Sequence, residues 1–180
     1  MTETQRATKL HDVVVVGAGA AGVGVAVTLK HAGIEDMLVV DRDTVGASFA
    51  SWPEETRFIT PSFPTNSIGM LDLNSIALGS SPAVTLQAEH PTGPQYAAYL
   101  TVIAQYFELP IYQQTDVLGV VKADEEFHIR IEEGLIRAKH LVWAAGEFQY
   151  PRRRGIRGAE HCTHTATVEA YADLEGDDFI

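Results

Sequence analysis

The sequence of 180 residues contains a single cysteine, Cys162, and little positive charge. One cysteine cannot form a disulfide within the chain, and it leaves no C-x-x-C pair for dithiol chemistry. Lys and Arg number 13 against 24 Asp and Glu, and the net charge of -11 argues against nucleic acid or an anionic membrane as the main partner. No apolar run approaches bilayer-spanning length, and residues 1–10 are too polar for a signal peptide. We therefore expect a polar leader over 1–10 and a cytoplasmic protein.

What the sequence does contain is a glycine-rich turn between a strand and a helix. Four valines, Val13 to Val16, predict a short buried strand, and Gly17, Gly19 and Gly22 follow at the spacing G-x-G-x-x-G. The first glycine lets the chain turn sharply, the second lets a pyrophosphate approach the backbone, and the third lets the helix pack on the strand. The N–H groups at the start of that helix attract phosphate.

An acid closes the next strand of this unit. The apolar run 37–41 predicts a second strand, and its last residue, Asp41, lies 19 residues after Gly22. At this distance a carboxylate accepts hydrogen bonds from an adenosine ribose. Strand, glycines, helix and acid agree, so the sequence predicts a dinucleotide site. The alternative is an ordinary strand–helix–strand turn whose glycines serve packing alone.

The remaining periodicity predicts an α/β fold. We expect a mainly parallel sheet in three layers, Rossmann-like, with a three-stranded antiparallel meander covering one face. Glycine and acid-rich breaks separate the strands of the meander. The elements expected are strands over 11–16, 37–41, 109–112, 115–122, 126–131, 134–138 and 140–145, and helices over 20–32 and 92–107, the second capped by Thr92.

A long irregular stretch, 42–91, separates the second strand from the second helix. A loop of this length is usually functional or ordered by what it binds. Residues 45–49 start a short helix, and 82–91 form an exposed connector. The stretch 58–67 has two readings: a proline-stiffened surface loop, or a wall for a flat ring system with Thr60 and Ser62 as hydrogen-bonding groups.

The C-terminal stretch from Tyr150 carries three features. The arginines 152–154 predict a solvated charge run rather than a phosphate site. Cys162 lies between His161 and His164, but three ligands this close do not complete a zinc site, so we expect no metal. The last residues, Asp177 to Ile180, look like the start of another buried strand, and we expect the chain to be a fragment of a longer protein.

Several of these motifs together resemble a known family. The glycine motif with Asp41, the segment V-G-A-S-F (45–49), the meander, and the strand ending in V-W-A-A-G-E-F-Q-Y-P (142–151) resemble the FAD-binding half of two-dinucleotide-domain flavoproteins. This superfamily includes flavin-containing monooxygenases and thioredoxin-reductase-like enzymes. The resemblance covers residues 11 to 180 and implies a FAD-binding Rossmann-like domain over 11–150, with a linker over 151–180 that leads toward an absent NAD(P)H domain.

The resemblance also implies which residues bind FAD. They are, in chain order, Gly17, Gly19, Ala20, Ala21, Gly22, Asp41, Arg42, Ser48, Phe49, Val117, Ala145 and Gly146. By this resemblance the glycine turn holds the pyrophosphate, Asp41 binds the adenosine ribose, Arg42 flanks the adenine, and Val117 meets the adenine through its backbone. The serine and phenylalanine lie near the pyrophosphate and ribityl chain, and the last two residues close over the cofactor.

The implied activity is that of a FAD-dependent, NAD(P)H-using oxidoreductase, monooxygenase-like or reductase, of which this chain is the FAD half. The fragment alone would be inactive, and we assign no catalytic residue. The substrate is an unidentified small molecule, and a homo-oligomer is left open. Two departures bear on the reaction class: Ala20 and Ala21 stand where bacillithiol-type reductases often have a cysteine, and 156–168 matches the monooxygenase fingerprint only in part.

Two other hypotheses remain. The chain is a non-catalytic flavin- or nucleotide-binding module, or it is a dehydrogenase domain whose glycine motif holds NAD. The meander and the closing A-A-G strand are typical of the FAD type and speak against the second alternative.

Overall fold

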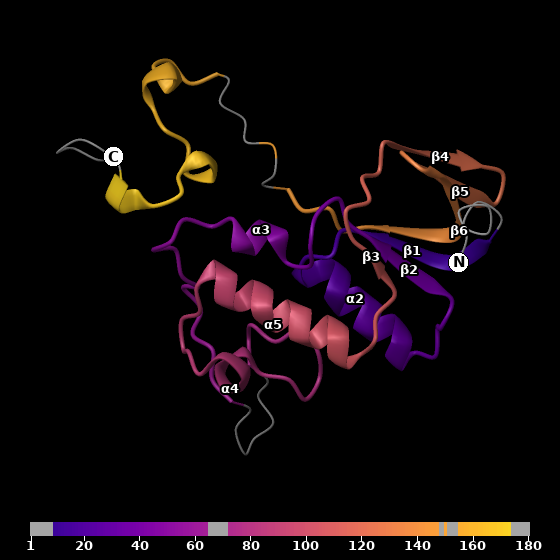
Figure 1. The fold of residues 1–180 in the computed structure, drawn as a ribbon, viewed down its shortest axis with the longest axis horizontal. Helices are drawn as coiled ribbons and strands as arrows, with labels where there is room; N and C mark the ends of the chain where they lie inside the picture. Colours follow the sequence, from indigo (N-terminus) through magenta and orange to yellow (C-terminus); the bar gives the residue numbers. More distant parts are fainter. Residues whose placement is uncertain (1–8, 65–71, 148–149, 151–154, 174–180) are drawn as a thin grey trace.

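The computed structural model describes residues 9–64, 72–147, 150 and 155–173. Along the chain, an α/β domain comes first, and three short 3-10 turns follow it among the described residues (Figure 1). The elements are β1 (Leu10–Val16), α2 (Ala20–His31), β2 (Met37–Val40), α3 (Ala47–Ala50), α4 (Pro82–Leu86), α5 (Gly93–Tyr106), β3 (Ile111–Tyr112), β4 (Gly119–Ala123), β5 (Glu126–Ile131), β6 (Gly134–Trp143), and the 3-10 turns Ala159–His161, Thr165–Thr167 and Tyr171–Asp173.

The strands form one six-stranded sheet in the order β3-β2-β1-β6-β5-β4. The first four of these run parallel, and β4, β5 and β6 pair antiparallel as the meander. The strand β6 belongs to both parts: Leu135 pairs with Arg130 of β5, whereas Val142 pairs with Val15 of β1. Ala138 has partners on both sides, Phe127 and His11.

The two strands expected over 134–138 and 140–145 are therefore wrong, because β6 is continuous. The chain exchanges one hydrogen-bonding partner for another at Arg137 and Ala138 without leaving the extended conformation. Two other boundaries also differ. The third strand is only Ile111–Tyr112, and the first meander strand starts at Gly119 rather than at 115.

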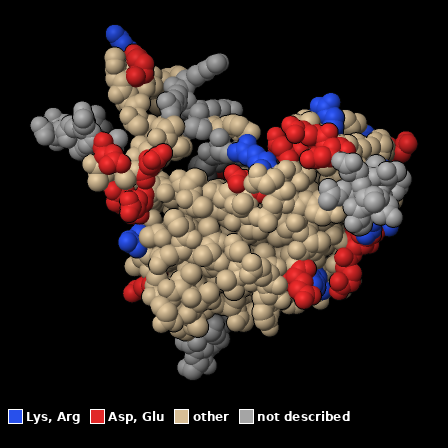
Figure 2. All heavy atoms as spheres, viewed as in Figure 1, with Lys and Arg blue, Asp and Glu red and all other residues tan. Residues whose placement is uncertain are grey.

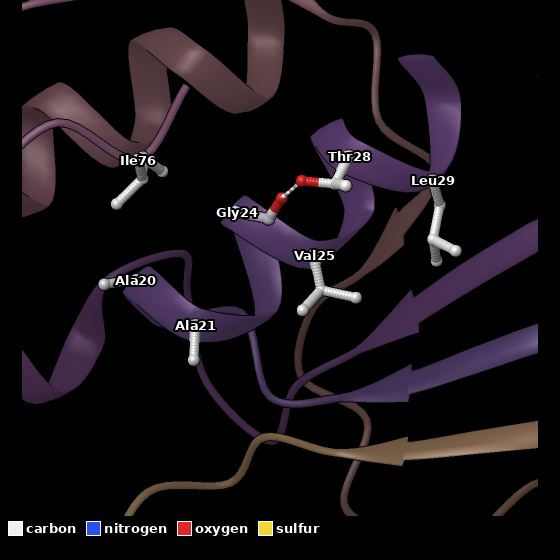
Figure 3. A pocket seen from close by; sticks show the side chains of 7 residues that line it. All are labelled: Ala20, Ala21, Gly24, Val25, Thr28, Leu29 and Ile76. Carbon is white, nitrogen blue, oxygen red and sulfur yellow. Dashed lines mark hydrogen bonds between the residues drawn. The ribbon is translucent and has the colours of Figure 1, made fainter. Parts of the chain in front are cut away.

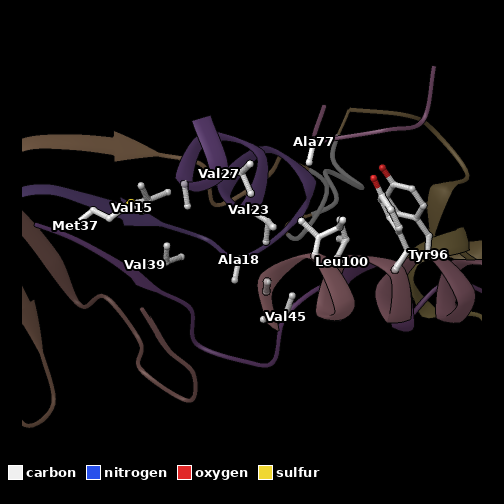
Figure 4. Close-up of a cluster of buried hydrophobic side chains, with 14 of the residues drawn as sticks. Val15, Ala18, Val23, Val27, Met37, Val39, Val45, Ala77, Tyr96 and Leu100 are labelled. Atoms are coloured by element: carbon white, nitrogen blue, oxygen red, sulfur yellow. The ribbon is translucent and has the colours of Figure 1, made fainter. Parts of the chain in front are cut away.

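Each face of the parallel strands β1 and β2 is covered by a different layer. On one face Val13, Val15 and Val39 pack with α2 and α5 in what we name the helix-side core (Figure 4). On the other face Val14 and Val16 pack with side chains of β5 and β6 in the meander-side core. Alternate valines of β1 point to opposite faces, as a strand buried on both sides requires. The expected three-layer α/β fold with a meander over one face is confirmed.

The helix α5 begins as its sequence predicts. The Thr92 hydroxyl accepts a hydrogen bond from the N–H of Gln95, whose side-chain oxygen accepts one from the N–H of Thr92, which completes a capping box. Tyr96 and Tyr99 are buried on its inner face, so they belong to the core.

The stretch 82–91 is the expected exposed connector only in its second half, where Gln87, Glu89 and His90 are exposed. Its first half is α4, which has Pro82 at its first turn and Ser81 as its N-cap. Pro82 and Pro91 are both fully buried. A helix of one turn is too short to show periodicity, which is why the sequence pattern missed it.

The segment 155–173 returns to the domain. The N–H of Glu54 donates to the carbonyl of Glu169 at 2.8 Å, and Val168 is buried. The N–H groups of Tyr171 and Ala172 donate to the carboxylate of Glu55 and hold the pKa of that carboxyl below its usual value. Of the leader expected over 1–10, residues 1–8 lie outside the described residues, as do the arginines 152–154 and the residues 177–180. Leu10, expected to end the leader, is instead the first residue of β1. Across the described ranges, none of the helices has the length and apolar character needed to cross a membrane.

Candidate functional site

The glycine turn lies at the carboxyl end of β1, between the ends of β2 and β6. Gly17 has a φ of +107°, and a Cβ there would overlap the carbonyl group of Ala144, just beyond β6. A Cβ on Gly22 would overlap the carbonyl of Gly17, one turn of chain away. These two glycines are therefore required by the fold itself, because backbone lies where any side chain would start.

Gly19 differs from its two neighbours in the motif. Its backbone is extended, with φ -77°, and a Cβ built on it would meet nothing within 4 Å. Packing therefore does not explain a glycine at this position. Gly19 is also the N-cap of α2, where no side chain caps the helix and no acid occupies the first turn. The first N–H groups of α2 thus face a space that is open above Gly19, which is the arrangement that accepts an anion.

Asp41 is bound to this turn. One carboxylate oxygen accepts the N–H of Ala18 at 2.5 Å, and the other accepts the N–H of Asp43 at 2.8 Å. Each oxygen can accept a further hydrogen bond, so the half-buried carboxylate is fixed beside the glycines with acceptor capacity left for a hydroxyl group.

Two further segments converge on the same edge. The N–H of Ala144 donates to the carbonyl of Val16 at 2.7 Å, which places the start of A-A-G beside the glycine turn. The N–H of Thr115 donates to the carbonyl of Asp41 at 2.8 Å, which brings the Val117 segment next to the acid. Val117 and Ala145 both pack against the meander-side core. The carboxyl edge of a parallel sheet is where ligands bind in such folds.

The helix α3 approaches the turn through its backbone. The N–H of Gly46 donates to the carbonyl of Ala18 at 3.0 Å. Ser48 is exposed on α3, whereas the ring of Phe49 packs among Trp52, Phe58 and Tyr96 with ring centroids 4.9–5.9 Å away. The backbone of α3 therefore lies beside the glycine turn. The ring of Phe49 points instead toward the helix-side core.

The two hydroxyl groups of the 58–67 stretch have different surroundings. Ser62 is buried, and its hydroxyl oxygen accepts a hydrogen bond from the Asn74 side chain at 2.7 Å. Thr60 is exposed, and its carbonyl accepts a second hydrogen bond from the same amide at 2.9 Å. Ser62 therefore fastens the long loop, and only Thr60 keeps its side chain accessible to a ligand.

A shallow pocket of about 380 Å³ lies on the outer side of α2 (Figure 3). Its lining is uncharged and consists of Ala20, Ala21, Gly24, Val25, Thr28, Leu29 and Ile76. The single side-chain hydroxyl in it, on Thr28, donates to the carbonyl of Gly24 within the helix. The lining of this pocket would favour an apolar group, and it has no positive charge to bind a phosphate.

Sequence reasoning missed Tyr150. The exposed side chain of Arg42 donates from Nη1 to the Tyr150 hydroxyl at 3.0 Å, although the two residues are 108 positions apart. No local pattern marks such a contact. The expected absence of a metal site stays a prediction: in the described ranges no group of three His, Cys, Asp or Glu residues converges, and Cys162 is exposed.

Known proteins and a protein-family model match most of this chain. A family model described as "Pyridine nucleotide-disulphide oxidoreductase" matches residues 14–180. A protein of Geobacillus kaustophilus, named "Uncharacterized oxidoreductase CzcO-like", is 32% identical over 140 residues, which are 78% of this chain and 37% of that protein. A "CzcO" oxidoreductase of Bacillus subtilis is 27% identical over 145 residues. The chain thus spans well under half the length of these curated relatives.

Solved structures share the fold at lower identity. A bacillithiol disulfide reductase from Staphylococcus aureus superposes with a TM-score of 0.70 at 20% identity, covering 84% of this chain and 43% of that one. A flavin-containing monooxygenase from Stenotrophomonas maltophilia gives 0.62 at 19% identity, covering 81% and 42%. At this identity the likeness shows the fold alone.

Proposed function

We propose that this chain, which belongs to the pyridine nucleotide-disulphide oxidoreductase family, is the FAD-binding part of a flavin-dependent oxidoreductase that uses NAD(P)H. The expected family is confirmed by the match over residues 14–180. When bound, the flavin supplies the electron transfer, and the chain supplies binding and orientation. We assign it a small-molecule substrate, no nucleic-acid or membrane partner, and the cytoplasm as its compartment.

The observation that carries the proposal is the open space above Gly19. Three glycines share one motif, but only Gly17 and Gly22 are explained by contacts within the protein. A Cβ on Gly19 would instead occupy space that adjoins the uncapped N-terminus of α2. The residues present therefore fit a dinucleotide, whose pyrophosphate would take that space and whose ribose would reach the carboxylate of Asp41.

The meander favours FAD over NAD as the dinucleotide bound at the glycine turn. It places the Val117 segment and the end of β6 on the two sides of the glycine turn, and both pack on the same core. A dehydrogenase domain with NAD in the first motif needs no such layer. In this proposal the reductant's site belongs to the part of the relatives that the chain does not match, since the match covers only 37% of the Geobacillus protein.

The chain's own residues would bind and orient the cofactor, and none of them would carry a covalent step. The N–H groups of the first turn of α2 would neutralise the pyrophosphate, and Asp41 would accept a ribose hydroxyl. Disulfide chemistry through a dithiol of this stretch is excluded, because Cys162 is its single cysteine. The described residues of this chain do not distinguish monooxygenation from reduction, and both remain within the proposal.

The test is a titration of the purified chain with FAD, followed by the visible absorbance of the bound flavin. Wild-type protein should bind FAD, whereas Gly19→Val should lose it by at least about 100-fold in affinity, because the branched side chain fills the pyrophosphate space. The same variant should keep its far-UV circular dichroism and its melting temperature, since the extended backbone at Gly19 accepts any residue.

Gly24→Ala on the same helix is the matched control. Its Cβ would lie 3.4 Å from the carbonyl oxygen of Ile76, on the pocket side of α2, so FAD affinity should be unchanged. A folded Gly19→Val protein that retains FAD would show that the cofactor lies elsewhere. A wild-type chain that binds NAD⁺ but no FAD would favour the dehydrogenase alternative.

A further inference from the structure

Two side chains meet across the edge that carries the glycine turn. Arg42 directly follows Asp41 at the end of β2, and Tyr150 follows the end of β6. The guanidinium Nη1 donates to the Tyr150 hydroxyl at 3.0 Å, and the guanidinium carbon lies 5.7 Å from the centre of the tyrosine ring. The contact is therefore made with the face of the ring as well as with its hydroxyl group.

The position of this pair follows from the strand order. β1 lies between β2 and β6, and Val16 pairs with Val40 on one side and with Trp143 on the other, so the three strands end level with one another. A contact between the segments that follow β2 and β6 must then pass over the end of β1. That end is the glycine turn, and Asp41 is bound to it through the N–H of Ala18.

An arginine–tyrosine pair on a surface contributes little to stability, so the fold gives no strong reason for it. Its chemistry points to a flat ring. A tyrosine face and a guanidinium plane both stack on a purine base, and such stacking is tolerant of how the base is oriented. The ring of Tyr150 is 74% exposed and has the area for such a contact. The pair stands next to the carboxylate that we assign to the adenosine ribose.

We infer that Tyr150 is a cofactor-binding residue that, together with Arg42, covers the adenosine end of the dinucleotide and stacks on its adenine. This inference rests on the proposed function. It adds to the predicted FAD site a residue that follows β6, on the other side of β1 from Asp41 and Arg42. In the bound state the base would lie against the phenol ring, and the guanidinium of Arg42 would remain beside that ring. The ligand chemistry concerned is an adenosine diphosphate group, which FAD, NAD⁺ and ADP share.

The experiment measures the equilibrium affinity of the chain for FAD and for ADP by isothermal titration calorimetry. Tyr150→Ala should lower both affinities by about tenfold, the effect of losing one base–aromatic stack. Tyr150→Phe keeps the ring and should stay within about threefold of wild type, since it loses only one exposed hydrogen bond. Both variants should keep the wild-type melting temperature in the absence of ligand.

Tyr106→Ala is the matched control, because Tyr106 is 79% exposed at the far end of α5 and should leave both affinities unchanged. Unchanged affinities in Tyr150→Ala would overturn the inference. Equal losses in the Phe and Ala variants would also overturn it, because the hydroxyl and not the ring would then carry the effect. If Gly19→Val loses FAD while Tyr150→Ala binds normally, the proposed function stands and this inference alone fails. A wild-type chain that binds neither ligand would overturn both.

Discussion

The helical layer and the meander layer differ in their content of charged residues. In the helical layer, which comprises α2, α3 with its N-cap Gly46, and the stretch from Phe58 to Phe107, the only Asp, Glu, Lys or Arg residues are Lys30, Asp72 and Glu89, and Asp72 is buried. The meander layer is dense in charge. Between Leu118 and His140 its charged residues are Lys122, Asp124, Glu125, Glu126, Arg130, Glu132, Glu133, Arg137 and Lys139. In Figure 2 the front face, over α2 and α5, is largely free of charge, and acidic side chains gather around its margins and over the strands.

The glycines differ in the same way. In the helical layer a Cβ on Gly22 or Gly93 would overlap backbone carbonyl groups, and one on Gly46 would press on Ala97. In the meander a Cβ on Gly119 would meet only the tip of the Arg130 side chain, at 3.6 Å. The helical layer is therefore packed backbone against backbone, whereas the meander is a solvated edge whose side chains can adjust. Charged residues on an edge strand also protect it from pairing with other chains.

Gly22→Ala should show the largest effect. The new methyl group overlaps the Gly17 carbonyl, and neither backbone segment can move without displacing β1 or α2. We expect a loss of about 3 kcal/mol of unfolding free energy or more, measured by urea denaturation of the chain. Gly119→Ala in the meander is the counterpart and should be close to neutral. Similar losses in the two variants would abolish the distinction between the layers.

Asp72→Asn tests the one buried charge of the helical layer. The carboxylate accepts hydrogen bonds from the Ser81 hydroxyl at 2.7 Å and from the N–H groups of Asn74 and Ala83 at 3.0 and 3.3 Å. An amide presents an NH₂ group to some of these donors, so we expect a loss of about 2 kcal/mol, measured in the same denaturation assay. Ser81→Ala removes one of these donors together with the side-chain N-cap of α4 and leaves the two N–H donors paired with the carboxylate, so we expect a smaller loss of about 1 kcal/mol. A neutral Asp72→Asn variant would mean that the long loop is not held through this carboxylate.

Tyr99→Phe should have a smaller effect. The buried hydroxyl accepts the N–H of Ile76 at 3.2 Å and shares a hydrogen bond of 2.7 Å with the Ser80 hydroxyl. Removing it leaves the ring in the helix-side core and takes away the acceptor of the Ile76 N–H, whereas the Ser80 hydroxyl keeps its hydrogen bond to the Ala77 carbonyl at 2.7 Å, so we expect a cost of about 1 kcal/mol. Thermal unfolding would detect it as a few degrees of lost melting temperature. Tyr106→Phe, on the exposed side of the same helix, is the control and should change nothing.

Glu126→Gln in the meander should have the smallest effect of the four. Its carboxylate receives Nε and Nη2 of Arg137, each at 2.8 Å, in a pair that is about one-third exposed on the arginine side. Exposed pairs contribute about 0.5 kcal/mol and are screened by salt. The difference between wild type and variant should shrink between 50 mM and 1 M NaCl. A cost above that of Tyr99→Phe would show that the meander depends on its charges more than its exposure suggests.

The sequence predicts the structure correctly where a feature depends only on residues close together in the chain. The glycine turn, the N-cap at Thr92 and the strand 126–131 are predicted by the sequence because backbone sterics, capping and alternation act locally. The continuity of β6 could not be read locally, because its two halves have different partners and burial patterns. Tyr150 and the Asn74 contacts to the 58–67 stretch join residues far apart in sequence, and only the folded chain reveals them.

The shared strand β6 makes the chain unequally tolerant of changes in length. One residue inserted within β6 would move Ala144 by one position relative to Gly17 and would exchange the side chains that face the two cores. Residues added at the turn around Asp124 and Glu125 would only lengthen an exposed connection. That turn is the place to insert a peptide tag or a reporter, and relatives of different length in this region should differ there and not within the strand.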